Sequence, residues 1–157
     1  MAAPDQIQCP DEPSQEKLIV RIDKVIPSDL RLLDDSVAEM VALIKRVAGW
    51  DDVEHIDLAL HEALANAMTH GNGCDSSKAV RVSVALEENR GLLVVVKDEG
   101  SGFEPSQLAN PLVGQNCLAS HGRGIFLISQ LTDNLHFKFD GGTAVCMRWR
   151  TSARPPG

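Results

Sequence analysis

Apolar side chains recur at helical spacing between Leu30 and Val47. Residues three and four positions apart share one face of a helix, and the charged residues between them take the other face. The apolar set is Leu33, Val37, Met40, Val41, Ile44 and Val47. A Pro-Ser-Asp sequence at 27–29 is a helix start signal, and Gly49 supplies a stop. The pattern predicts an amphipathic helix that ends at Gly49.

A second helix is predicted to run as far as His70. The acidic residues Asp51 and Asp52 precede it, where they would cap its first turn. Its apolar residues are Leu58, Leu60, Ala63, Leu64 and Ala67. Glu62, Asn66 and His70 recur every four residues, so a helix stacks them as one polar stripe. The Gly-Asn-Gly sequence at 71–73 tolerates positive φ angles and ends the helix.

Short runs of β-type residues predict five strands, and one more helix lies among them. The strands are Lys17–Ile22, Ala79–Leu86, Leu92–Lys97, Leu135–Phe139 and Thr143–Arg150, and the helix is Ile125–Leu131. Turn sequences at 87–91 and 140–142 join two pairs of strands as hairpins. This order implies a two-layer α/β sandwich, in which helices cover one face of a mixed, mostly antiparallel sheet.

The stretch from Asp98 to Gly124 is long, weakly periodic and rich in Gly, Pro, Ser, Asn and Gln. Loops of that length inside a compact domain are usually functional, and many of them are lids. We therefore expect a functional loop here.

Composition and charge are those of an ordinary globular protein. The chain has 157 residues, of which 43% are hydrophobic and 24% charged, enough for a single domain with a core. The predicted domain spans 17–150, with loose tails at 1–16 and 151–157. A net charge of −7 argues against a protein that binds nucleic acid by neutralising phosphates. Four scattered cysteines, no signal peptide and no membrane-length apolar run predict a cytoplasmic protein with reduced thiols.

The polar stripe on the second helix has two interpretations. The Glu62 carboxylate could accept a proton from a nucleophile, and the Asn66 carboxamide one turn later could hold a divalent cation. A solvated helix face has the same pattern. Residues downstream decide between the two.

Two glycine motifs stand where a nucleotide site would need them. Asp98, Gly100 and Gly102 follow a strand, where a carboxylate can accept the amino group of adenine and glycines let the backbone approach the base. Gly122-Arg123-Gly124 opens a helix, whose N-terminal N–H groups and dipole favour a phosphate, and Arg123 could add a charged contact. Each motif alone is weak evidence.

A third motif, Gly141-Gly142-Thr143, enters the last strand, where the hydroxyl group of Thr143 could help to hold the edge of the base. The four motifs together, in this order, resemble the ATP-binding domain shared by DNA gyrase, heat-shock chaperones, sensor histidine kinases and mismatch-repair ATPases, which is the GHKL superfamily with the Bergerat fold. Within it, the chain resembles the small bacterial anti-sigma factor serine/threonine kinases. The resemblance covers about Lys17 to Arg150.

That resemblance implies a function and a set of partners. Such a kinase would use ATP and Mg²⁺ to phosphorylate a STAS-type anti-sigma factor antagonist. It would also bind and inhibit a sigma factor and form a homodimer, without binding nucleic acid or a membrane directly. The first strand and helix, which lie upstream of every ATP motif, are the expected place for the dimer interface.

The resemblance also implies a role for each motif residue. Glu62 would be the general base and Asn66 the ligand of Mg²⁺. Asp98 would bind adenine in a pocket shaped by Gly100 and Gly102, with Thr143 nearby. The phosphates would be held by Gly122, Gly124 and their neighbour Arg123, and His70 and Asn72 would line the phosphate side.

One departure from the family pattern keeps a second function open. Several such kinases have a basic residue just before the second glycine motif, whereas this chain has Ser120-His121, so Arg123 or His121 would have to substitute. The alternative is an ATP-gated binding module with little turnover that sequesters a regulatory partner. The catalytic domain of a sensor histidine kinase would need an upstream helical hairpin with a phosphoacceptor histidine, and the first predicted helix contains no His. A scaffold domain that uses no nucleotide would leave four ordered motifs unexplained.

Overall fold

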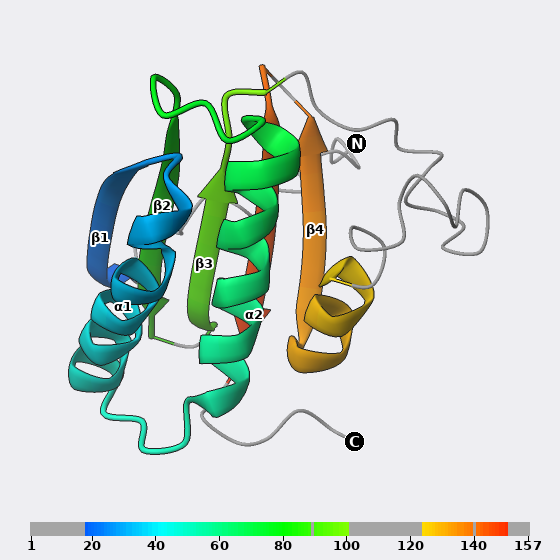
Figure 1. Ribbon diagram of the computed structural model, residues 1–157. Coiled ribbons are helices and arrows are strands. Elements are labelled where there is room, and N and C mark those ends of the chain that lie inside the picture. Colours follow the sequence, from blue (N-terminus) through cyan, green and yellow to red (C-terminus); the bar gives the residue numbers. More distant parts are fainter. Residues whose placement is uncertain (1–17, 89, 101–123, 140, 151–157) are drawn as a thin grey trace, which may run out of the picture.

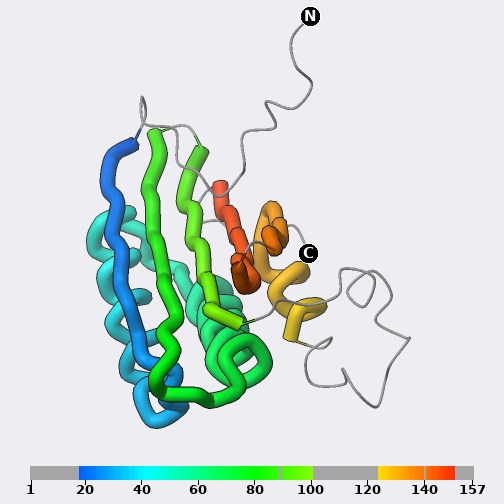
Figure 2. Tube along the Cα trace, turned by 90° about the horizontal axis from the view of Figure 1, so that it is seen from above, coloured from blue at the N-terminus to red at the C-terminus, as the bar shows by residue number. Residues whose placement is uncertain are grey.

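A five-stranded antiparallel sheet organises the computed structural model, which describes residues 18–88, 90–100, 124–139 and 141–150. Within these residues the strands are β1 (Leu18–Pro27), β2 (Ala79–Glu87), β3 (Gly91–Lys97), β4 (Asn134–Phe139) and β5 (Thr143–Trp149). Their order in the sheet is β1-β2-β3-β5-β4, which Figure 2 follows from blue to red and orange. All four pairings between described strands are antiparallel, where a mixed sheet was expected.

The helices lie together on one face of this sheet (Figure 1). They are α1 (Leu33–Ala48), α2 (Glu54–Asn66) and the helical residues 124–131. Alternate strand residues point toward them, because successive side chains in a strand face opposite ways. The core joins Met40 and Ile44 of α1 and Leu60 of α2 to Val94 and Met147 of the sheet. The predicted two-layer α/β sandwich is confirmed.

The ends of α1 follow the signals in the sequence. The Asp29 carboxylate accepts a hydrogen bond from the N–H of Arg31 and starts a short 3-10 turn, η2 (Leu30–Leu32), which leads into α1. Gly49 ends the helix in the left-handed conformation, with φ at 69°. The first strand was predicted only to Ile22, whereas β1 continues through Asp23 and Lys24 to Pro27. As part of the edge strand β1, these charged residues are well tolerated.

The second helix differs from its prediction at both ends. It begins at Glu54, with Val53 at the N-cap position and no side-chain cap, so the prediction that Asp51 and Asp52 cap it is wrong. At its other end the α-helix stops at Asn66 and widens into a π-helical turn, η3 (Ala67–Gly71). The N–H of Asn72 donates to the carbonyl of Ala67 five residues earlier, at 2.8 Å.

Several predictions fall on residues that the structure does not describe. The two predicted tails and most of the predicted functional loop, residues 101–123, lie outside the described residues. None of the described helices is long and apolar enough to cross a membrane.

Candidate functional site

The fold brings Glu62 and Asn66 of α2 against Gly124, at the start of helix 124–131. A Cβ atom built on Gly124 would lie 2.9 Å from Nδ2 of Asn66 and 3.0 Å from Oε2 of Glu62. Both side chains are half-buried. The carboxylate and the carboxamide thus lie together at the N-terminal end of a helix. The first N–H groups of a helix have no partner within the helix and favour an anion.

Asp98 is the centre of a second part of the site, at the end of β3. Its side chain is only 3% exposed, and its Oδ1 accepts hydrogen bonds from the N–H groups of Gly100 and Thr143, at 2.9 and 3.0 Å. Its own N–H donates to the carbonyl of Thr143 at 3.0 Å. These bonds hold the carboxylate in one orientation, with Oδ2 next to Gly71.

The hydroxyl group of Thr143 is an unsatisfied polar atom next to this carboxylate. Thr143 is 1% exposed, and its Oγ1 has no hydrogen-bond partner among the residues that the structure describes. A buried hydroxyl without a partner costs roughly 1–3 kcal/mol, so such an atom needs an explanation. A ligand edge bound between Thr143 and Asp98 would supply the missing partner.

Three glycines allow close backbone contact around Asp98. A Cβ on Gly71 would overlap the Asp98 carboxylate, and one on Gly142 would overlap the Asp98 backbone carbonyl. A Cβ on Gly100 would overlap the carbonyl oxygen of Gly71. Sequence reasoning gave Gly71 only the role of ending a helix and Gly142 that of a turn. The signal was the glycine itself, at positions where a flat ligand or another backbone comes close.

Asn72 holds this part of the site in place. Its Nδ2 donates to Oγ of Ser28 at 2.7 Å and to the carbonyl of Ala79 at 3.0 Å, and its Oδ1 accepts from the N–H of Glu99 at 2.7 Å. The side chain is buried and makes these three bonds within the protein. The expectation that Asn72 lines the phosphate side is therefore wrong: it connects Ser28, the residue after β1, and Ala79 of β2 to the residue after Asp98.

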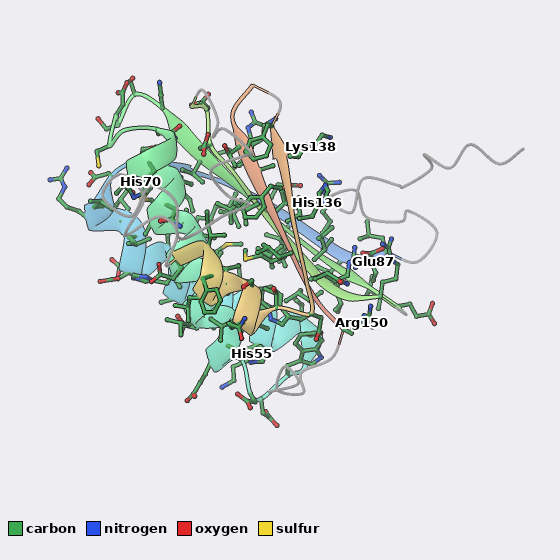
Figure 3. The ribbon with its side chains drawn as sticks, turned by 90° about the vertical axis from the view of Figure 1, so that its right-hand side faces the viewer. His55, His70, Glu87, His136, Lys138 and Arg150 are labelled. Atoms are coloured by element: carbon green, nitrogen blue, oxygen red, sulfur yellow. The ribbon has the colours of Figure 1, made fainter. Side chains whose placement is uncertain are left out.

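His70 is separated from the other two members of the stripe by the change in helix type. It lies in the π-helical turn and is exposed, on the helix side of the sheet (Figure 3). Glu62 and Asn66 lie in the α-helical part and contact the position of Gly124. The structure thus brings together Glu62, Asn66 and Gly124, but His70 is not among these contacts.

The remaining predicted site residues, Gly102, Gly122 and Arg123, lie outside the described residues, as does the Ser120-His121 pair. Among the described residues no group of three or more His, Cys, Asp or Glu side chains could hold a metal ion. Asn66 is the predicted metal ligand that the structure does place, and its amide oxygen is the kind of hard donor that Mg²⁺ prefers.

The fold is the α+β fold of histidine kinase-like ATPase domains. The sequence matches the family of histidine kinase-like ATPase domains over residues 26–149, and the chain belongs to this family.

Curated relatives within the family are protein kinases by name. The chain is 32% identical over 107 residues to serine-protein kinase RsbW of Bacillus licheniformis, covering 62% of this chain and 65% of that one. It is 30% identical over 128 residues to serine-protein kinase RsbW of Bacillus cereus, covering 70% and 77%. The chain thus spans about 65% of the length of the first of these relatives.

Solved structures show the same fold. The RsbU and RsbW domains of Rv1364c from Mycobacterium tuberculosis match with a TM-score of 0.60 at 19% identity, over 83% of this chain and 32% of that one. The histidine kinase domain of the blue-light activated kinase from Erythrobacter litoralis matches with a TM-score of 0.52 at 20% identity, over 76% of this chain and 61% of that one.

Proposed function

We propose that the protein is an ATP-dependent serine/threonine protein kinase of a bacterial partner switch. Its substrate would be a STAS-type anti-sigma factor antagonist, and the kinase would also bind and inhibit a sigma factor in the cytoplasm. The observation that carries the proposal is the placement of Glu62 and Asn66 against Gly124, in a chain that also buries Asp98 beside the unsatisfied hydroxyl of Thr143. The relatives named serine-protein kinase support this reaction class.

In this proposal the adenine edge is recognised at Asp98. Oδ2 of Asp98 would accept a hydrogen bond from the exocyclic amino group, and the Thr143 hydroxyl would complete the contact. Guanine has a carbonyl oxygen at that position, so the carboxylate would repel it. The two backbone N–H groups that donate to Oδ1 keep the acceptor aimed before the nucleotide binds.

The phosphates would lie near the start of helix 124–131. Its N–H groups would donate to phosphate oxygens, and the amide oxygen of Asn66 would be a ligand of Mg²⁺. When bound, Mg²⁺ neutralises charge on the phosphates. Gly102, Gly122 and Arg123 would add contacts from the predicted functional loop.

Glu62 would act on the incoming nucleophile. Its Oε2 faces the position of Gly124, so it stands beside the place proposed for the phosphates. From there it would accept the proton of a seryl or threonyl hydroxyl as the oxygen attacks phosphorus. General base catalysis of this kind contributes roughly 10²- to 10⁴-fold in rate.

The test is phosphotransfer by Glu62→Gln with a candidate antagonist protein, labelled ATP and Mg²⁺. Gln keeps the shape of Glu but cannot accept the proton, so we expect transfer to fall at least about 100-fold while ATP affinity stays within about threefold. Asp57→Asn, on an exposed part of α2, is the matched control and should transfer at the normal rate. Full transfer by Glu62→Gln would refute the assigned role.

The second candidate is the ATP-gated binding module, favoured by Ser120-His121 in place of a basic residue. It predicts tight ATP binding, and partner binding that depends on ATP, without label on any partner serine or threonine. The wild-type protein in the same assay separates the two functions.

A homodimer is proposed on the edge that β1 forms with the start of α1. Large apolar side chains are exposed along β1, at Ile19 and Val25, and in η2 before α1, at Leu30 and Leu32. Burying these side chains against a second copy would remove them from water. Size-exclusion chromatography with light scattering should show a dimer for the wild type and a monomer for Val25→Asp. A monomeric wild type would refute it.

A further inference from the structure

The face of the sheet opposite the helices has an apolar side chain, Leu93, near its centre, although no described helix covers it. Leu93 and Cys146 point to it and are 2% exposed, and Arg148 is 6% exposed. The described helices all lie on the other face (Figure 1). An antiparallel sheet face in water normally carries polar, exposed side chains. The apolar side chain of Leu93 at the centre of this face therefore indicates that it is a contact surface.

A cavity of about 510 Å³ opens on this side, which is within the size range of ligand sites. Leu93 and Cys146 are among its apolar lining residues, and the basic residues around it are Arg90, Arg148 and Arg150, with His136 beside them. Figure 3 shows His136, Lys138 and Glu87 on the side of the sheet away from the helices.

The charge of this face is opposite to that of the whole chain. The buried carboxylate of Glu87 pairs with Arg148 at 2.9 Å and with Arg90 at 3.4 Å, so it offsets part of their charge. The guanidinium group of Arg150 has no carboxylate partner among the described residues. Lys138 adds a further cation on β4. A chain with a net charge of −7 thus has a positively charged cavity on one face.

An acidic segment of the same chain begins next to this cavity. Leu18, the first residue of β1, pairs with Glu87, which itself contacts Arg90 and Arg148. The seventeen residues before it include Asp5, Asp11, Glu12 and Glu16, against the single basic side chain of Lys17.

Length and composition also suit this segment to the cavity. Seventeen extended residues reach up to roughly 55 Å, whereas five strands about 4.8 Å apart span roughly 19 Å between the outer two. Prolines at 4, 10 and 13 favour an extended conformation and cannot donate to a sheet edge.

We propose that residues 1–17 dock across the uncovered face of the sheet, with their carboxylates in the cavity between Arg90, Arg148 and Arg150. The occupant is an acidic, proline-containing peptide of the chain itself. The docked segment shields the Cys146 thiol from solvent. Because this face is opposite to the nucleotide site, the contact is independent of ATP binding.

The test measures alkylation of Cys146 by N-ethylmaleimide in the full chain, at peptide level by mass spectrometry. Asp5→Asn, Asp11→Asn, Glu12→Gln and Glu16→Gln together remove the acidic charge of the segment, and we expect the Cys146 rate to rise about tenfold. Swapping Asp and Glu at the same four positions keeps the charge and should leave the rate unchanged. The exposed Cys74 is the internal reference and should react equally in all variants.

A second variant tests the other partner in the contact. Arg150→Gln should raise the Cys146 rate on its own and should add little to the neutralised segment, because both changes break the same contact. Raising NaCl from 0.05 to 0.5 M should have the same effect in the wild type, since salt screens the attraction. An unchanged Cys146 rate in the neutralised segment would overturn the proposal. A wild-type rate that rises on dilution would also overturn it, in favour of a second copy as the occupant.

Discussion

Replacing Asp98 with Asn should remove most ATP binding and leave the fold intact. Oδ1 of Asp98 accepts the N–H groups of Gly100 and Thr143, and the amide oxygen of Asn can accept both. The amide NH₂ then takes the place of Oδ2, beside Gly71. The adenine amino group would meet a donor where the wild type has an acceptor.

The size of each effect follows from these contacts. A hydrogen bond to a charged group is worth about 1.5–3 kcal/mol, and a buried donor without a partner costs about 1–3 kcal/mol. Together they predict a loss of about 3 kcal/mol or more in binding, which raises Kd by at least roughly 100-fold. The free energy of unfolding should change by less than about 1 kcal/mol, because both hydrogen bonds to the backbone are kept.

Asp98→Ala is the informative comparison for stability. It removes the acceptor of two N–H groups in a buried site, so the free energy of unfolding should fall by about 3 kcal/mol. Urea denaturation measures this change, and calorimetric titration with ATP and Mg²⁺ measures Kd. The reasoning is refuted if Asp98→Asn binds ATP within threefold of the wild type, or if it loses as much stability as Asp98→Ala.

Three further predictions concern the neighbouring residues. Gly124→Ala places a Cβ about 3 Å from Glu62 and Asn66 and should slow phosphotransfer roughly tenfold. The melting temperature should not fall, because Ala favours helix. An unchanged phosphotransfer rate would contradict the close contact. Asn72→Ala leaves buried partners unsatisfied and should lower the free energy of unfolding by about 3 kcal/mol, whereas a loss under about 1 kcal/mol would contradict its role. His55 is 7% exposed, its Nε2 has no partner among the described residues, and burial lowers its pKa. Because protonating this buried imidazole is unfavourable, the free energy of unfolding should be highest above about pH 6.5 and fall below it. A His55→Phe variant with the same pH dependence in urea titrations would refute this.

Local patterns were sufficient to predict the helices and strands but not the order of the strands. Each predicted hairpin forms, with β2 beside β3 and β4 beside β5. Nothing in the local sequence specifies that β5, rather than β4, pairs with β3. This pairing places Thr143 next to Asp98, 45 residues away in the sequence, and so creates the adenine part of the candidate site.

The π-helical turn shows why the stripe on α2 could not be understood from periodicity alone. Residues 67–71 fit an α-helix in sequence, yet the turn is widened where Gly71 packs against residues 98–100 at the end of β3. Its Cα faces the Asp98 carboxylate, and its carbonyl lies against Gly100. Asn72 then fixes the end of the turn through three buried hydrogen bonds. These are tertiary constraints, so they override the local preference. They also give the members of the stripe different surroundings: Glu62 and Asn66 contact the start of a helix, and His70 lies exposed in the widened turn.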